Sequence, residues 1–287
     1  GLTGTMVYAF GASAAYIACA LLVVLVTVHV IWVRERVGER RLPWSRGEAQ
    51  QVNILAQADH WLPLLKGALR NTFSRQSLSY FPILVSVGLT YGICLIAVPM
   101  IATGETGWAE DQLGSLNGTA QLVAGVATIA IGGFAVGKLG AQRAFWISRC
   151  AFIALTGWMI WMADSWSDPR VLIIFVLGWT VLHFFGAISE VVINMRLSPP
   201  AIAATQFSIF MAFSNMGISL AGILIGSIAM LSEPKAMLMF LIGVHILSVL
   251  ILLVVKYPTR QIGALDITPA TGTDPAVADP IAHPARD

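Results

Sequence analysis

Charged residues are scarce in this sequence. Only 11% of its 287 residues are Asp, Glu, Lys or Arg, and 57% are hydrophobic, whereas a typical soluble domain carries about 25% charged residues. A chain this apolar cannot cover its nonpolar surface in water, so the composition predicts an integral membrane protein. The net charge of +2 is too small to indicate a nucleic-acid partner.

Motifs of soluble catalytic domains are also missing. The sequence has no Walker phosphate-binding loop, no HExxH motif, no acidic metal cluster and no GxSxG in a strand–turn–helix setting. Its three cysteines, Cys19, Cys94 and Cys150, show neither CxxC nor Cys/His spacing, and we interpret them as small buried residues. We therefore predict a protein that is not an enzyme and that uses no cofactor or metal.

Seven apolar segments run through the chain, each near the length of about 20 residues that a helix needs to cross a bilayer. Residue 1 is Gly and no charged region precedes the first segment. We therefore do not interpret that segment as a signal peptide, and we expect the chain to be a piece of a longer one. The predicted transmembrane helices are about 7–33, 79–103, 113–137, 144–163, 171–195, 201–230 and 235–256.

The connections between these segments alternate in charge. The stretch 34–78 is strongly basic, whereas the connection 104–112 is acidic and has no base, and the alternation continues along the chain. Because basic residues favour the cytoplasmic side, this pattern predicts that Gly1 lies outside and that Asp287 lies in the cytoplasm.

Two stretches fall outside the predicted spans. The connection 34–78 is predicted to be a cytoplasmic linker whose second part forms an amphipathic helix at the membrane surface; a partner-binding role for it stays open. The tail 257–287 is rich in Pro, Ala, Thr and Asp and is predicted to be disordered. In the surface helix, Trp61, Leu64, Leu65 and Leu69 should face lipid, and Lys66 and Arg70 should lie among the headgroups.

Polar side chains are concentrated in the second, third, fifth and sixth segments, whereas the fourth and seventh are almost entirely apolar. Since polar groups avoid lipid, the four polar segments should line a cavity or a helix contact, and the other two should face lipid. His183, near the expected midplane, could bind substrate or relay a proton, or could simply bond a neighbouring helix. The cavity-lining candidates are Tyr80, Tyr91, Asn117, Gln121, His183, Gln206 and Asn215.

Each of these candidates has a simpler alternative. Tyr80 would also serve as an interfacial anchor, and Asn117 and Gln121 would also serve as polar contacts between helices. Glu190 is the only carboxylate inside the seven segments, and a buried carboxylate is costly unless it is paired or protonated.

The run GGFAVGKLGAQRAFW (residues 132–146), together with Glu190 and Arg196, resembles the major facilitator superfamily. That family has a G-x-x-x-D-R/K-x-G-R/K loop after the second helix of each half, and a Glu followed by Arg where the fourth helix ends. Gly133, Lys138, Gly140 and Arg143 resemble the loop, whereas Gly137 stands where the family has Asp. The resemblance implies that the first segment is the sixth helix of the full protein and that the last six form its C-terminal six-helix bundle.

The resemblance also implies a cytoplasmic gate. In the family these charges latch the helix ends, so Glu190 would pair with Lys138, Arg143 or Arg149, with Arg196 beside it. Two alternatives stay open: Glu190 pairs only locally with Arg196, or it carries a proton. The missing N-terminal six-helix half would be the partner of this bundle within one alternating-access transporter.

A narrower resemblance lies in the stretch 195–217, where Ala204, Thr205, Gln206 and Phe207 are similar to a run in AmpG-type muropeptide permeases. It implies proton-coupled import of cell-wall fragments across the bacterial inner membrane. The alternatives are a carrier of sugars, drugs or acyl-CoA from another branch of the superfamily, and a non-transporting membrane receptor or scaffold. An intramembrane enzyme is a more distant alternative.

Overall fold

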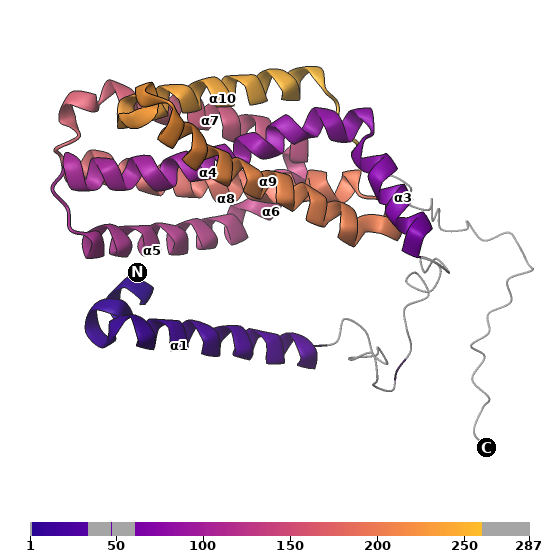
Figure 1. Cartoon of the computed structure of the whole chain (residues 1–287), viewed down its shortest axis with the longest axis horizontal. Helices are drawn as coiled ribbons and strands as arrows, with labels where there is room; N and C mark the ends of the chain where they lie inside the picture. The colour runs from indigo at the N-terminus through magenta and orange to yellow at the C-terminus, as the bar shows by residue number, and fades with distance from the viewer. Residues whose placement is uncertain (1, 34–46, 48–60, 260–287) are drawn as a thin grey trace, which may run out of the picture.

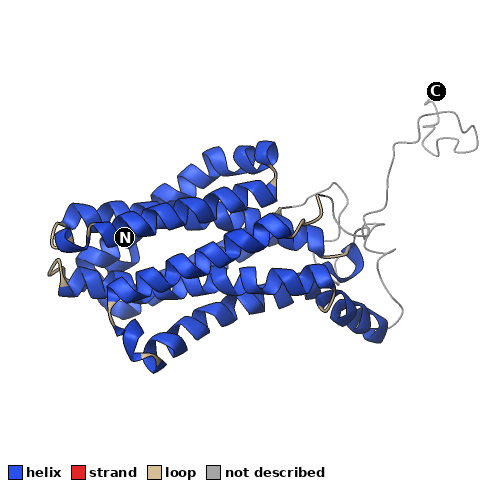
Figure 2. Cartoon of the chain, turned by 90° about the horizontal axis from the view of Figure 1, so that it is seen from above, coloured by secondary structure: helices blue, strands red, loops and turns tan. Residues whose placement is uncertain are grey.

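The computed structural model describes residues 2–33, 47 and 61–259, in which the chain is helical with short connections. The predicted tail from residue 260 onward and the first part of the predicted linker lie outside the described residues, as do the side chains of Trp61 and Leu64. Figures 1 and 2 show the long helices running side by side. The α-helices are α1 (Leu2–Trp32), α3 (Trp61–Thr72), α4 (Arg75–Gly104), α5 (Glu110–Ala127), α6 (Gly133–Leu139), α7 (Ala141–Trp161), α8 (Pro169–Leu197), α9 (Ala203–Ser227) and α10 (Pro234–Val254).

The helices begin and end where local chemistry requires it. Ser74 caps α4 by accepting a hydrogen bond from the Ser77 N–H (3.3 Å), and Asp168 caps α8 by accepting one from the Arg170 N–H (2.9 Å). Gly140 separates α6 from α7 with φ of +80°, a left-handed conformation that favours glycine.

Six helical spans in the described part of the chain are long and apolar enough to cross a membrane, and α1 adds a shorter apolar stretch, Tyr16–Trp32. One of the six, Glu110–Leu139, joins α5 to α6 through a π-helical turn, η1 (Thr128–Gly132). Short 3-10 turns, η2 (Ala163–Ser165), η3 (Pro200–Ile202) and η4 (Ala229–Ser232), lie in the later connections. The predicted all-helical membrane fold is confirmed.

The closest helix contact joins α4 to α9 through two glycines. A Cβ atom on Gly88 would overlap the carbonyl oxygen of Ser214 and would lie 2.9 Å from the Cα of Gly217. A Cβ on Gly217 would in turn overlap the carbonyl oxygen of Val85. Backbones approach this closely only where both helices present small residues, so this pair fixes the crossing point of α4 and α9.

The other long helices complete the bundle around this pair. α8 lies between α5 and α7, and α10 packs on α4 and α7. His245 of α10 is buried and stacks on Phe152 of α7 with ring centroids 4.8 Å apart. α1 runs beside α5, and its described side chains from Tyr16 onward are largely exposed (Figure 1).

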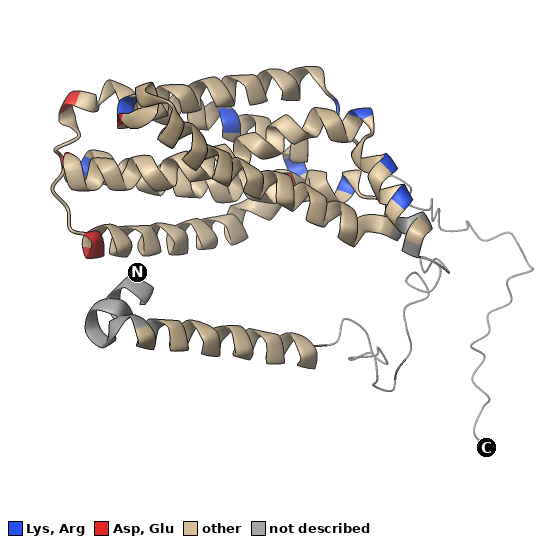
Figure 3. Ribbon diagram, in the orientation of Figure 1, with Lys and Arg blue, Asp and Glu red and all other residues tan. Residues whose placement is uncertain are grey.

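Charge divides the two ends of the bundle. The loops that follow α4, α7 and α9 carry acidic residues, and Figure 3 shows these gathered at one end. At the opposite end, which we call the basic end, the described loops carry no acidic residue. The cations of the basic end are Lys66, Arg70, Arg75, Lys138, Arg143, Arg196 and Lys256.

The amphipathic helix α3 lies against the basic end. Ala68 and Thr72 are buried, and the Asn71 Nδ2 donates a hydrogen bond to the carbonyl oxygen of Leu197 (3.0 Å). The opposite side of the helix is exposed and includes Leu62, Leu65, Lys66, Leu69 and Arg70. α3 therefore packs on the bundle with one face and keeps a mixed apolar and basic face outside.

Candidate functional site

A cavity of about 320 Å³ lies between α4, α5 and α8. An aromatic wall forms part of it, because the ring of Tyr91 lies 5.1 Å from that of His183 and 6.0 Å from that of Trp179. Asn117 and Gln121 contribute two amides from α5. Aromatic faces and amides in one cavity suit a ligand that has both apolar surface and hydrogen-bonding groups.

A second cavity of about 230 Å³ shares Tyr91 and His183 with the first. It extends along α8 from His183 to Glu190 and is closed on another side by Ser214 and Asn215 of α9. His183 and Glu190 are seven residues apart, which places them on one face of the helix. The two cavities adjoin at Tyr91 and His183, and we call them together the polar column, which α4, α5, α8 and α9 border.

Five of the seven sequence-predicted cavity residues line this column: Tyr91, Asn117, Gln121, His183 and Asn215. Tyr80 and Gln206 are buried outside both cavities. The ring of Tyr80 packs against Tyr257 (centroids 5.1 Å apart), and the Gln206 Oε1 accepts a hydrogen bond from the Thr72 hydroxyl (3.2 Å). Tyr80 therefore contacts the segment that follows α10, and Gln206 joins α9 to α3.

Glu190 is deeply buried, with 5% of its surface exposed. Its Oε1 has no hydrogen-bond partner among the described residues, whereas its main-chain carbonyl accepts a hydrogen bond from the Tyr80 hydroxyl (3.3 Å). A carboxylate in such surroundings needs a nearby positive charge or a proton.

Arg149 of α7 supplies a positive charge inside the same bundle. Only 1% of its surface is exposed, and its guanidinium lies 4.4 Å from the ring centroid of Phe145 and 5.7 Å from that of Phe152. The guanidinium and the Glu190 carboxylate attract each other electrostatically. Two guanidinium nitrogens, Nε and Nη1, make no hydrogen bond among the described residues, so Arg149 has donors left for a partner.

The other cations of the predicted gate lie elsewhere. Lys138 is exposed and sits 4.7 Å above the ring of Phe134, while Arg143 and Arg196 line a separate pocket at the basic end. The structure therefore does not bring Lys138, Arg143 or Arg196 to the Glu190 carboxylate. The sequence indicates Arg149 only as one of three possible partners for Glu190. Its position inside the predicted segment 144–163 is the signal that could have placed it within the membrane.

No group of three or more His, Cys, Asp or Glu side chains in the described part of the chain could hold a metal ion. The polar column offers amides, hydroxyls, an imidazole and a buried carboxylate, and these groups bind solutes and exchange protons. Cavities of this kind between membrane-spanning helices are typical of multi-pass membrane proteins that bind small solutes, which include transporters.

The family model of the Major Facilitator Superfamily matches residues 1–221, and the chain therefore belongs to this superfamily of membrane transporters. The protein is thus a multi-pass transporter of a small solute, and not an enzyme. Comparisons with curated proteins and with solved structures found no match.

Proposed function

We propose that this protein is a proton-coupled importer of a muropeptide-like solute across the bacterial inner membrane. The observation that carries the proposal is the polar column, in which His183 and Glu190 share one face of α8 and an aromatic and amide lining. An amino sugar with a short peptide would stack its apolar ring faces on Tyr91 and Trp179 and bond the amides of Asn117 and Gln121.

The column is incomplete within this chain. Gln121 and Asn215, on its two flanks, are exposed, although polar side chains avoid lipid in a membrane. We infer that an N-terminal six-helix half covers this face and that the substrate binds between the two halves, as in transporters that rock around a midplane site. α1 would then be the sixth helix, at the edge of the described bundle.

The two acid–base groups would provide the proton coupling. Glu190 would alternate between a protonated state and an ion pair with Arg149, since a buried carboxylate is stabilised in either form. His183 would bind the substrate, because its side chain lines both cavities. In this proposal the buried Arg149 acts at Glu190, while the exposed Lys138 and Arg143 and the half-buried Arg196 would latch the cytoplasmic ends when the two halves meet.

The charge difference between the two ends supports the proposed orientation. Cations of membrane proteins are enriched on the cytoplasmic side, so the basic end would face the cytoplasm and the acidic loops the periplasm. The residues after α10 would then be cytoplasmic.

Uptake by the full-length protein in proteoliposomes tests the proposal. With the outside acidified, a labelled anhydromuropeptide should accumulate, and a protonophore should abolish the accumulation. Accumulation of a sugar, a drug or acetyl-CoA in its place would assign the protein to another branch of the superfamily. Binding of solute without any translocation would favour a receptor.

A further inference from the structure

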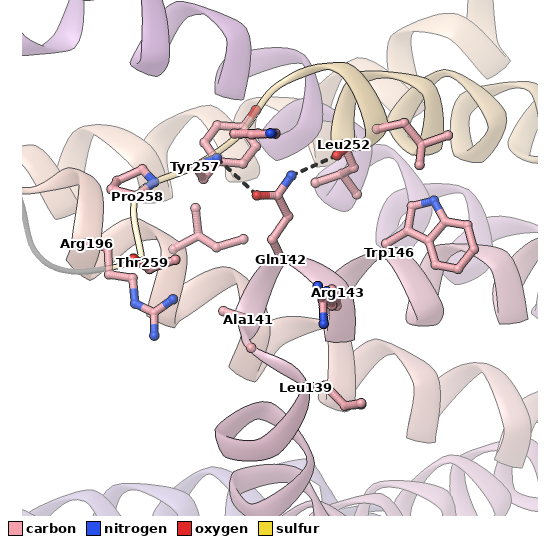
Figure 4. A pocket seen from close by; sticks show the side chains of 14 residues that line it. Leu139, Ala141, Gln142, Arg143, Trp146, Arg196, Leu252, Tyr257, Pro258 and Thr259 are labelled. Atoms are coloured by element: carbon pink, nitrogen blue, oxygen red, sulfur yellow. Dashed lines mark hydrogen bonds between the residues drawn. The ribbon is translucent and has the colours of Figure 1, made fainter.

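A third cavity, of about 550 Å³, lies at the basic end between α7, α8 and α10, apart from the polar column. Three cations line it: Arg143 of α7 and Arg196 of α8, which Figure 4 labels, and Lys256, which follows α10. None of the fourteen lining residues is acidic. We propose that this cavity binds the phosphate-bearing headgroup of an anionic phospholipid.

The cavity has a built framework, centred on Gln142. Its Nε2 donates hydrogen bonds to the carbonyl oxygens of Leu252 (2.7 Å) and Val255 (2.6 Å), and its Oε1 accepts one from the Tyr257 N–H (3.0 Å). The Tyr257 hydroxyl donates to the Ser79 carbonyl oxygen (3.2 Å). These bonds hold the chain after α10 against α7, so Lys256 is kept at the cavity.

The phenol of Tyr257 contributes to this framework at any physiological pH. Burial raises the pKa of the Tyr257 hydroxyl to about 12. The hydroxyl therefore stays protonated and remains a donor to Ser79. The two guanidinium groups lie below Gln142 in Figure 4, with Arg196 at the left and Arg143 near the centre.

Exposed apolar side chains beside the cations distinguish a lipid from a free phosphate. Leu139 is 41% exposed and Leu253 is 60% exposed, and both line the cavity. In a membrane these side chains border acyl chains, while Arg and Lys extend toward the headgroups. A ligand with a phosphate joined to acyl chains would contact both sets of groups, as lipids do in basic pockets between transmembrane helices.

The test measures binding of phosphatidylglycerol to the purified full-length protein in neutral detergent by native mass spectrometry. Each juxtamembrane cation strengthens binding of an anionic lipid by a factor of about five. The triple variant Arg143→Gln/Arg196→Gln/Lys256→Gln should therefore weaken the tightest phosphatidylglycerol site by on the order of 100-fold. The matched control Arg170→Gln/Lys235→Gln, which removes two cations near the acidic end, should leave it unchanged.

The proposal would be overturned by unchanged phosphatidylglycerol affinity in the folded triple variant, by equal affinity of the wild type for phosphatidylcholine, or by displacement of the lipid by millimolar inorganic phosphate. The first result would show that the cations do not contribute to lipid binding. The second would show an apolar groove without headgroup selectivity, and the third would show a site for soluble anions. Arg143→Lys/Arg196→Lys keeps both charges and should retain most of the affinity. A loss in this variant equal to that of the triple variant would also contradict the proposal, because a folding defect would then explain both.

Discussion

The Tyr80 hydroxyl donates a hydrogen bond to the main-chain carbonyl of Glu190, so α4 is joined to α8 at the turn that carries the buried carboxylate. The same ring packs against Tyr257, and the Tyr257 hydroxyl donates a hydrogen bond to the Ser79 carbonyl oxygen in α4. The position of Glu190 therefore depends on side chains that never enter the polar column. This connection links the column to the basic end of the bundle.

Removing the Tyr80 hydroxyl should have a small effect. Tyr80→Phe loses one hydrogen bond and keeps the ring contacts, so we expect a loss of about 1 kcal/mol in the free energy of unfolding. Tyr80→Ala, which also removes the ring, should cost about 3–5 kcal/mol. Thermal unfolding of the purified protein in detergent measures both, and equal losses in the two variants would contradict this division.

The contact between α4 and α9 should tolerate no side chain at its two glycines. Gly88→Ala and Gly217→Ala place a methyl group against backbone atoms of the facing helix, so we expect loss of the monodisperse protein in gel filtration. Gly222→Ala in the same helix, α9, is the matched control, because nothing lies within 4 Å of its Cβ position. Equal recovery of the Gly88 and Gly222 variants would refute this account of the crossing.

Arg149 and Glu190 should be energetically coupled. Arg149→Gln removes the buried charge that attracts the Glu190 carboxylate, which we expect to cost about 1–3 kcal/mol of stability. The double variant Arg149→Gln/Glu190→Gln removes both charges and should recover part of that loss. Arg143→Gln, an exposed cation of the same helix, should change stability by less than about 0.5 kcal/mol. Strictly additive losses in the double-mutant cycle would show that the two side chains do not interact.

The amides of α5 should contribute to solute affinity. Asn117→Ala and Gln121→Ala each remove hydrogen-bonding groups from the first cavity, so KM for the transported solute should rise by about five- to tenfold per variant. Thr119→Ala provides the control, since Thr119 is exposed on the same helix, lines neither cavity, and donates its hydroxyl to the Ser115 carbonyl oxygen. An unchanged KM in both amide variants would exclude these side chains from the binding site.

Hydropathy sufficed to predict the spans because a bilayer imposes a length on each helix. The predicted segment 79–103 corresponds to α4 (Arg75–Gly104), and 171–195 corresponds to α8 (Pro169–Leu197). The sequence does not reveal the π-helical turn within Glu110–Leu139, because a π turn has no distinct hydropathy pattern.

The site was less accessible to sequence reasoning. A polar residue in a span can face a cavity or a neighbouring helix, and composition does not separate His183, which lines both cavities, from Gln206, which joins α9 to α3. Arg149 falls inside the predicted segment 144–163, but the family resemblance names it together with Lys138 and Arg143 as a partner of Glu190. Only tertiary structure separates this buried cation from the two exposed ones. The pairing of Gly88 with Gly217 depends on tertiary structure, since glycines are common in membrane helices.

Proton-driven uptake by variants of the polar column tests the central claim most directly. In proteoliposomes with an imposed inward proton gradient, His183→Ala and Glu190→Gln should each abolish accumulation of labelled anhydromuropeptide, while Thr119→Ala retains it and all three variants reconstitute in equal amounts. Unchanged accumulation in both the His183 and Glu190 variants would contradict the account.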